Sequence, residues 1–270
     1  MQKKFTGCLI ASDLDNTLLN SKGQLSDESR EAIEYFIQNG GYFTICTGRT
    51  YLSFRDMFSK VPINAPVILG NGALIYDYNN EKLIYICYLD DTSAPDIVND
   101  VRTKFPKCAC EIYGFNSVAL TNINEVSENH MKNFGLEYEL IPDPYKIKQP
   151  WLKAIFTGEN EYLKQIEAYI RPKALQMHFV FSVPVFFEMV NGSVNKGAGV
   201  KRLADYLGVG YDKIYTVGDH LNDIDLLKSA AVSFCPENSE PEIKEIAAVI
   251  LPNNNNHTIK ALIEYIEKQL

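Results

Sequence analysis

Apolar and polar residues follow one another in blocks near the start of the chain, and these blocks predict a strand, a helix and a second strand. The apolar run Leu9–Ala11 predicts a buried parallel strand that ends just before Asp13. From Ser26 to Ile37, a capping serine and acidic residues precede apolar residues at helical spacing. The apolar run 42–46 predicts the next strand, and a right-handed crossover would bring the two strand ends together.

A hairpin, an inserted segment and a return to the first pattern follow. Asn71-Gly72 is a strong turn signal between predicted antiparallel strands. From about 88 to 185 the pattern changes to shorter elements: helix-like 96–105 and 161–170, and strand-like 110–115, 151–157 and 178–181. A helix at Lys196–Leu207 and a strand at Lys213–Val217 then resume the earlier pattern. The sequence therefore predicts an α/β fold, with a doubly wound, mostly parallel, Rossmann-like core at 1–85 and 187–270 and an inserted α+β domain at 86–186.

Net charge, the length of apolar segments and the cysteines disfavour several classes of protein. The 270 residues carry a formal net charge of -8, which disfavours nucleic-acid binding. No segment has the apolar length needed to span a bilayer, and the apolar stretch after Lys3 and Lys4 stops at Asp13, too soon for a secretory signal. Six dispersed cysteines are typical of buried free thiols in a reducing cytoplasm, and Cys108-Ala109-Cys110 has no second cysteine pair nearby. We therefore expect a cytoplasmic protein without a membrane or nucleic-acid partner. The sequence carries no signal for oligomeric state.

Four polar fragments stand where chemistry is expected in such a sheet. Asp13 and Asp15 emerge one residue apart from the first strand, at the carboxyl edge where open α/β sheets place their ligands. Thr47-Gly48-Arg49 follows the second strand, and Asn195-Lys196-Gly197 opens a helix. The loop 218–223, which contains Asp219, Asn222 and Asp223, follows a later strand. All four could meet at one edge, where they would form a metal and phosphate site.

This set of fragments, in this order, resembles the haloacid dehalogenase superfamily of phosphatases. The position of the insertion resembles the Cof-type group with its type IIB cap. The resemblance covers essentially the whole chain, strongly over the core and loosely over the cap. It implies a Mg²⁺-dependent phosphatase for small phosphorylated metabolites, such as sugar phosphates, whose specificity depends on the cap. Asn16 stands where the Cof-type group more often has glycine.

The resemblance also implies a role for each residue. Asp13 would attack phosphorus and become an aspartyl phosphate, and Asp15 would protonate the leaving oxygen and then activate water. Mg²⁺ would be held by Asp13, by the Asp15 backbone carbonyl and by Asp219, with Asp223 acting directly or through water. The phosphoryl oxygens would be bound by the Leu14 and Gly48 N–H groups and by the side chains of Thr47, Lys196 and Asn222.

Charge supports the acid role of Asp15 independently of the resemblance. Three carboxylates and a phosphate sum to roughly -5, which magnesium and one lysine reduce to about -2, so repulsion favours a proton on Asp15. Two other functions stay open. A phosphomutase would share the aspartyl phosphate but return the group to its substrate, and a phosphate-responsive sensor or regulatory module would keep the aspartyl phosphate. Asp15, placed to activate water, favours hydrolysis.

Overall fold

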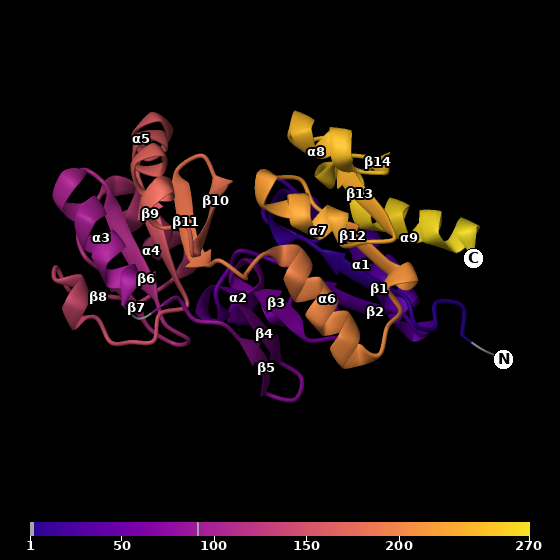
Figure 1. Ribbon diagram of the computed structural model, residues 1–270. Helices are drawn as coiled ribbons and strands as arrows, with labels where there is room; N and C mark the ends of the chain where they lie inside the picture. Colours follow the sequence, from indigo (N-terminus) through magenta and orange to yellow (C-terminus); the bar gives the residue numbers. More distant parts are fainter. Residues whose placement is uncertain (1–2, 91) are drawn as a thin grey trace. The chain divides into compact units, whose positions relative to one another are not determined.

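The chain forms two compact units in the computed structural model, which describes residues 3–90 and 92–270 (Figure 1). The first unit holds the chain up to Gly48, Arg55–Tyr85 and Asn195–Leu270, and the second holds Arg49–Phe54 and Ile86–Val194. The predicted boundary at 186 falls at the start of strand β11 (Phe186–Asn191), which pairs with strands of the second unit. The second unit therefore continues to Val194. Residues 1, 2 and 91 of the predicted domains lie outside the described residues.

A parallel five-stranded sheet forms the centre of the first unit, in the order β14-β13-β12-β1-β2. Its strands are β1 (Leu9–Ser12), β2 (Tyr42–Ile45), β12 (Ile214–Val217), β13 (Val232–Pro236) and β14 (Val249–Leu251). Strand β1 lies between β12 and β2, in parallel with both. The polar residues that follow these three strands are therefore neighbours at one edge, and the predicted α/β class is confirmed.

Helices join the strands of the first unit (Figure 1). They are α1 (Asp27–Gln38), α6 (Lys196–Leu207), α7 (Ile224–Lys228), α8 (Pro241–Ile246) and α9 (Thr258–Gln269), and α2 (Tyr51–Phe58) spans residues of both units. Leu9 and Ala11 pack in one apolar cluster with residues of α6 and α7, whereas Ile10, by strand alternation, points to the other face. Helix α1 packs against α9. Because both faces of β1 are buried, its end is held firmly.

A smaller three-stranded sheet, in the order β3-β4-β5, extends the first unit. Strand β3 (Val67–Leu69) pairs antiparallel with β4 (Leu74–Asp77), as the hairpin signal predicts, and β5 (Lys82–Ile86) follows. A parallel bridge between Cys46 and Ile68 places β3 beside the end of β2. The turn Gly70–Gly72 between β3 and β4 therefore lies at the edge of the sheet where β2 ends.

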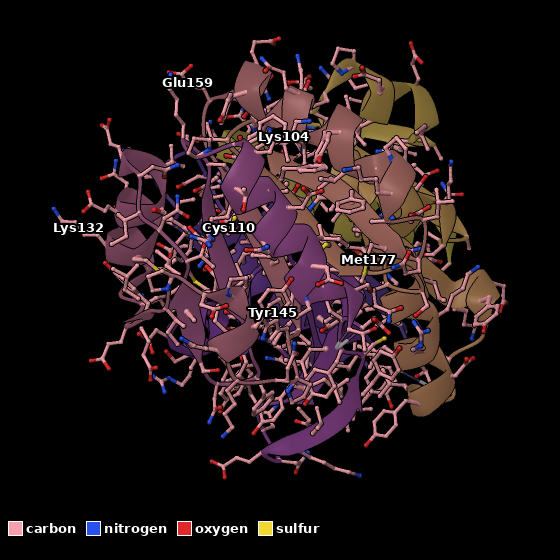
Figure 2. All side chains as sticks on the ribbon, turned by 60° about the vertical axis from the view of Figure 1, so that its left-hand side comes forward. Lys104, Cys110, Lys132, Tyr145, Glu159 and Met177 are labelled. Carbon is pink, nitrogen blue, oxygen red and sulfur yellow. The ribbon has the colours of Figure 1, made fainter. Side chains whose placement is uncertain are left out.

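The second unit is built on a six-stranded sheet in the order β10-β11-β9-β6-β7-β8. The strands besides β11 are β6 (Ala109–Tyr113), β7 (Val118–Leu120), β8 (Glu139–Leu140), β9 (Lys153–Thr157) and β10 (Met177–Val183). Helices α3 (Ser93–Lys104) and α5 (Asn160–Ile170) share an apolar cluster with Cys110 and Met177. Cys110 and Met177, which are labelled in Figure 2, are buried in this unit, whereas Lys132 and Glu159 are exposed. Helix α4 (Glu125–Phe134) contributes Met131 to a second cluster with Tyr113 and Ile155.

Short helical turns complete the described chain, and they include Pro144–Lys146, Arg171–Lys173, Tyr211–Lys213 and Asn254–Asn256. In the part of the chain that the structure describes, no helix combines the length and apolar character needed to cross a bilayer.

Candidate active site

The chain turns sharply after β1 and separates the first two aspartates. The Asp13 N–H donates to the Val217 carbonyl at 2.9 Å, which holds Asp13 beside the end of β12. The side chain of Asp13 is buried, whereas Asp15 is exposed. Asn16 has a φ of 59°, a left-handed conformation that asparagine and glycine adopt more readily than other residues. This turn therefore directs one carboxylate into the site and leaves the other accessible to solvent.

Lys196 joins two buried aspartates. Its Nζ donates to Asp13 Oδ1 and to Asp223 Oδ1, each at 2.6 Å, and the residue is 1% exposed. The lysine occupies the first position of α6, whose N-terminus is capped by Asn195 Oδ1, which accepts from the Ala198 N–H at 2.7 Å. A buried ammonium is tolerated because carboxylates surround it. The start of α6 thus delivers a fixed positive charge to the end of β1.

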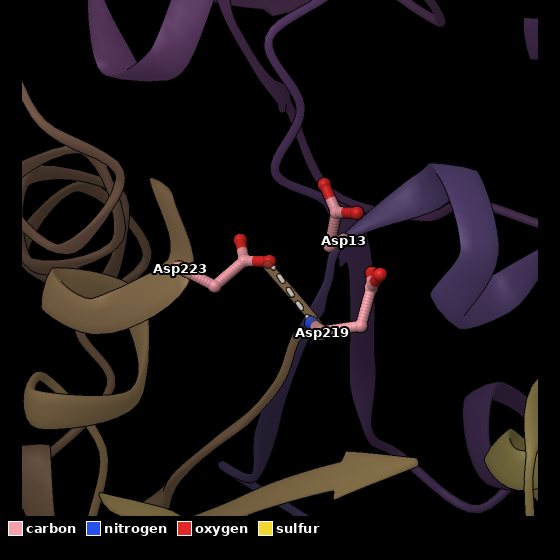
Figure 3. Close-up of side chains that lie close together, drawn as sticks. All are labelled: Asp13, Asp219 and Asp223. Carbon is pink, nitrogen blue, oxygen red and sulfur yellow. Dashed lines mark hydrogen bonds between the residues drawn. The ribbon is translucent and has the colours of Figure 1, made fainter. Parts of the chain in front are cut away.

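The loop after β12 supplies two further carboxylates. Asp223 Oδ2 accepts from the N–H groups of Asp219 at 3.0 Å and His220 at 3.1 Å, and Figure 3 marks the first of these bonds. A Cβ at Gly218 would overlap the Asp223 side chain, so the folded-back loop requires glycine there. Thr17 donates its hydroxyl to Asp219 Oδ1 at 2.5 Å. Each carboxylate is therefore oriented by a hydrogen bond from its surroundings.

The grouped carboxylates fit a hard divalent cation. Asp13, Asp219 and Asp223 are buried and each offers an oxygen, and these atoms all lie within 4.8 Å of one another (Figure 3). Lys196 contributes one positive charge against the three negative ones, so the cluster keeps an excess of negative charge. Carboxylate oxygens are the ligands that Mg²⁺ prefers. The donor set that the structure brings together is therefore suited to magnesium.

Burial and charge change the protonation of this cluster. Burial raises the pKa of Asp13 well above its ordinary value, although the Lys196 ammonium acts in the opposite direction. Burial, and next the charge of Asp223, raise the pKa of Asp219 to about 7, against the lowering effect of the Thr17 hydrogen bond. Burial alone would lower the pKa of Lys196, but the charges of Asp13 and Asp223 raise it above its ordinary value. The lysine is therefore a permanent cation, whereas Asp13 and Asp219 accept protons more readily than an ordinary aspartate.

The residues predicted to bind phosphate lie at the same edge. Leu14 and Thr47 are buried, and Leu14 and the Thr47-Gly48 pair follow β1 and β2 closely. The Thr47 N–H donates to the Ile68 carbonyl at 2.9 Å, which fixes this residue against β3. Asn222 donates from Nδ2 to Asn71 Oδ1 at 3.1 Å. The structure gathers these groups, and their contact with phosphate stays a prediction.

Two residues of the site had no role in the sequence-based prediction. Thr17 stands within the first polar fragment, and its position after the two aspartates is the signal that could have included it. The Asn71-Gly72 pair predicts only a hairpin turn, and the hydrogen bond from Asn222 to Asn71 joins positions 151 residues apart. A contact between residues so far apart in the sequence leaves no pattern in the sequence around either of them.

Comparison with known proteins identifies the family. A family model described as haloacid dehalogenase-like hydrolase matches residues 10–263. A Buchnera aphidicola protein (subspecies Acyrthosiphon pisum) that carries the provisional name of a phosphatase is 31% identical over 240 residues, 87% of each chain. A Bacillus subtilis protein named 5-amino-6-(5-phospho-D-ribitylamino)uracil phosphatase is 27% identical over 250 residues, 91% of this chain and 90% of that one.

A solved structure supports the same assignment of the fold. It is described as a subclass IIB sugar phosphatase of the haloacid dehalogenase superfamily, and it matches with a TM-score of 0.82 and 17% identity over 96% of this chain and 98% of that one. The family model and the named relatives confirm the resemblance to this superfamily, which the four polar fragments predict, and to its Cof-type group, which the position of the insertion predicts. With the family model covering nearly the whole sequence, the chain belongs to the haloacid dehalogenase-like hydrolases and is a phosphatase of that family.

Proposed function

We propose that this phosphatase is a cytoplasmic, Mg²⁺-dependent hydrolase of small phosphorylated metabolites that works through an aspartyl phosphate on Asp13. One observation carries the proposal: Lys196 bridges Asp13 and Asp223 within a buried cluster whose three carboxylates exceed its positive charge. Such a cluster favours a divalent cation and a phosphoryl group placed next to it. The six cysteines are all free, which agrees with a reducing compartment.

Asp13 and Asp15 divide the chemistry between them. The Asp13 carboxylate attacks phosphorus, and the bond from phosphorus to the leaving oxygen breaks while Asp15 gives its proton to that oxygen. Asp15, now ionised, takes a proton from a water molecule that attacks the same phosphorus, so the bond to Asp13 breaks and inorganic phosphate leaves. A buried nucleophile and an exposed proton carrier suit these two tasks.

The surrounding groups stabilise negative charge on the phosphoryl oxygens. The Lys196 ammonium, the Thr47 hydroxyl, the Asn222 amide and the N–H groups of Leu14 and Gly48 would donate to these oxygens. Magnesium, when bound, would neutralise phosphoryl charge, and Asp13, the Asp15 carbonyl, Asp219 and Asp223 would hold it. Because the protein groups are fixed before substrate arrives, little reorganisation would be needed at the moment of reaction.

For the substrate we propose a phosphorylated sugar or sugar alcohol. The B. subtilis relative is named for a phosphoribityl compound and the matched structure is described as a sugar phosphatase, which supports this class. A panel of sugar phosphates, nucleotides, phosphoglycolate, pyridoxal phosphate and flavin mononucleotide would test it. The proposal predicts the highest kcat/KM on a sugar or polyol phosphate, and the highest value on a nucleotide or on phosphoglycolate would contradict it.

Phosphate release from p-nitrophenyl phosphate tests the mechanism. We expect chelation to abolish release and added magnesium to restore it. Asp13→Asn should unfold as cooperatively as the parent protein but lose at least about 10³-fold in kcat, since it removes the nucleophile. The matched control is Asp56→Asn, whose side chain is 86% exposed and should leave kcat unchanged.

Three outcomes would contradict parts of this proposal. Retained turnover in Asp13→Asn would exclude Asp13 as the nucleophile. Interconversion of sugar phosphates without net phosphate release would indicate a phosphomutase. A phosphorylated protein that persists after substrate is exhausted would indicate the regulatory module instead.

A further inference from the structure

The turn between β3 and β4 has an unusual backbone for a buried position. Asn71 is 2% exposed and has a φ of 57°, and Gly72 follows with a φ of 102°. Asparagine tolerates the left-handed region better than most residues, but the conformation still has a cost. Buried positions keep such a conformation where surrounding contacts fix it, and these positions cluster at functional sites. The contacts that fix this turn therefore indicate its role in the protein.

Three contacts of the turn lead to elements of the candidate active site. The Asn71 N–H donates to the Thr47 carbonyl at 3.0 Å, and Asn71 Oδ1 accepts from Asn222 Nδ2 at 3.1 Å. A Cβ at Gly72 would overlap the Asn195 carbonyl oxygen, so glycine lets the turn approach the start of α6 closely. The turn thus touches the end of β2, the loop after β12 and the residue before Lys196. These are three of the segments predicted to surround the phosphoryl group.

The bond to Asn222 has a chemical consequence because a side-chain amide has two different ends. One end is an NH₂ group with two hydrogens, and the other is an oxygen that accepts. When one Nδ2 hydrogen is given to Asn71 Oδ1, the second remains available to an anion on the same side of the amide. A rotated amide would present its oxygen to the phosphoryl oxygens, and two acceptors repel one another.

We propose that Asn71 is a positioning residue that fixes the amide of Asn222 with its NH₂ group toward the phosphoryl site. This inference rests on the proposed function, in which Asn222 donates to a phosphoryl oxygen. The Asn71 side chain acts through Asn222, without contacting the phosphoryl group itself. Loss of the Asn71 side chain should therefore weaken phosphate binding and also slow phosphoryl transfer.

Asn71→Gly isolates the side chain from the backbone. Glycine adopts a positive φ without strain, so this variant keeps the turn and removes the acceptor oxygen. We expect kcat/KM for p-nitrophenyl phosphate to fall about 10- to 100-fold, the range typical of a site whose supporting hydrogen bond is lost, and the inhibition constant of inorganic phosphate to rise by a similar factor. The matched control is Asn80→Gly, an exposed position in the next turn of the same small sheet, which should stay within about twofold of the parent protein.

A double-mutant cycle distinguishes a positioning role from a general structural one. Because Asn71 acts through Asn222, Asn222→Ala should lose at least as much as Asn71→Gly, and the double variant should lose no more than Asn222→Ala. If the losses in kcat/KM of the two single variants multiplied in the double variant, the proposal would be overturned. Parental kcat/KM in Asn71→Gly, or in Asn222→Ala, would overturn it as well.

The same variants separate this inference from the proposed function. If the parent protein releases no phosphate from any ester, the proposed function fails. The thermal shift caused by inorganic phosphate with magnesium then still tests Asn71. A shift that is smaller in Asn71→Gly than in the parent and in Asn80→Gly would support the positioning role, and equal shifts in all three would overturn it.

Discussion

Lys196 shows at the scale of single residues how the site tolerates so much buried charge. The ammonium is 1% exposed and donates to carboxylates from two segments that are distant in sequence. Removal of one member of a buried ion pair leaves its partner without compensation, which costs far more than the pair itself contributes. Loss of Lys196 should therefore destabilise the fold, besides removing the cation that we propose binds the phosphoryl group.

Lys196→Met should lower the free energy of unfolding by about 3–5 kcal/mol at pH 8, because Asp13 and Asp223 then face each other without a cation. The loss should be smaller at pH 5.5, because burial raises the pKa of Asp13 well above its ordinary value and a proton can neutralise that carboxyl group. Urea unfolding of the metal-free protein at both pH values measures it, with the exposed Lys201→Met as control. An equal loss at both pH values would contradict the ion-pair explanation.

Chain order was enough to predict which charged residues meet. Asp13 and Asp219 each follow a strand of one parallel sheet, and Lys196 opens a helix, so topology alone places them at one edge. Thr17 and Asn71 escaped prediction because their contacts depend on the shape of turns. Both turns contain an asparagine with positive φ, at positions 16 and 71. Such conformations depend on tertiary contacts as well as on the local sequence.

At the scale of elements, apolar periodicity decides which segments can be predicted. The sequence predicts helix α6 at Lys196–Leu207, and the helix in the structure has the same bounds. Helix α4 was missed because its buried residues are Ser127 and Met131, too few to form an apolar stripe. Its start is instead specified by hydrogen bonds between Asn124 and Ser127. Strand β11 was missed because the buried Glu188 interrupts its apolar pattern.

Gly218→Ala should damage the loop after β12, because the new Cβ would overlap the Asp223 side chain that caps the following N–H groups. We expect a loss of about 1–3 kcal/mol in the free energy of unfolding, as for other overpacked buried sites, together with weaker magnesium binding. Thermal unfolding and magnesium titration measure the two effects. Gly158→Ala is the control, since its Cβ would meet its nearest neighbour at 3.8 Å. Parental values for both measurements in Gly218→Ala would contradict the steric argument.

At the scale of the whole molecule, the site makes stability depend on pH and metal. The pKa of Asp219 lies at about 7 in the folded protein and at 3.8 in its ordinary state, so between these values the folded protein binds more protons than the unfolded one. The stability of the metal-free protein should therefore decrease as pH rises through this window. Magnesium bound by these carboxylates would replace those protons and remove the cost.

Magnesium should consequently raise the melting temperature more at pH 8 than at pH 6, since at pH 6 protons compete for the same carboxylates. Differential scanning fluorimetry with and without magnesium at both pH values measures this difference. In Asp219→Asn the difference between the two pH values should shrink, because the titrating ligand is lost. A magnesium shift of equal size at pH 6 and pH 8 in the parent protein would contradict the linkage.

The chain passes between its two units directly beside two residues of the candidate site. Gly48 is the last residue of the first unit before a crossing, and Lys196 follows the return crossing by one residue, after Val194 and Asn195. The second unit is therefore joined to the first next to residues of the candidate site at two of its four junctions. A chimaera that exchanges it between family members should be spliced after Tyr85 and before Asn195, so that the recipient keeps the residue that caps the lysine's helix. A joint moved one residue later would exchange Asn195, which caps the lysine's helix, together with the second unit, and a change of specificity could then not be distinguished from an effect on Lys196.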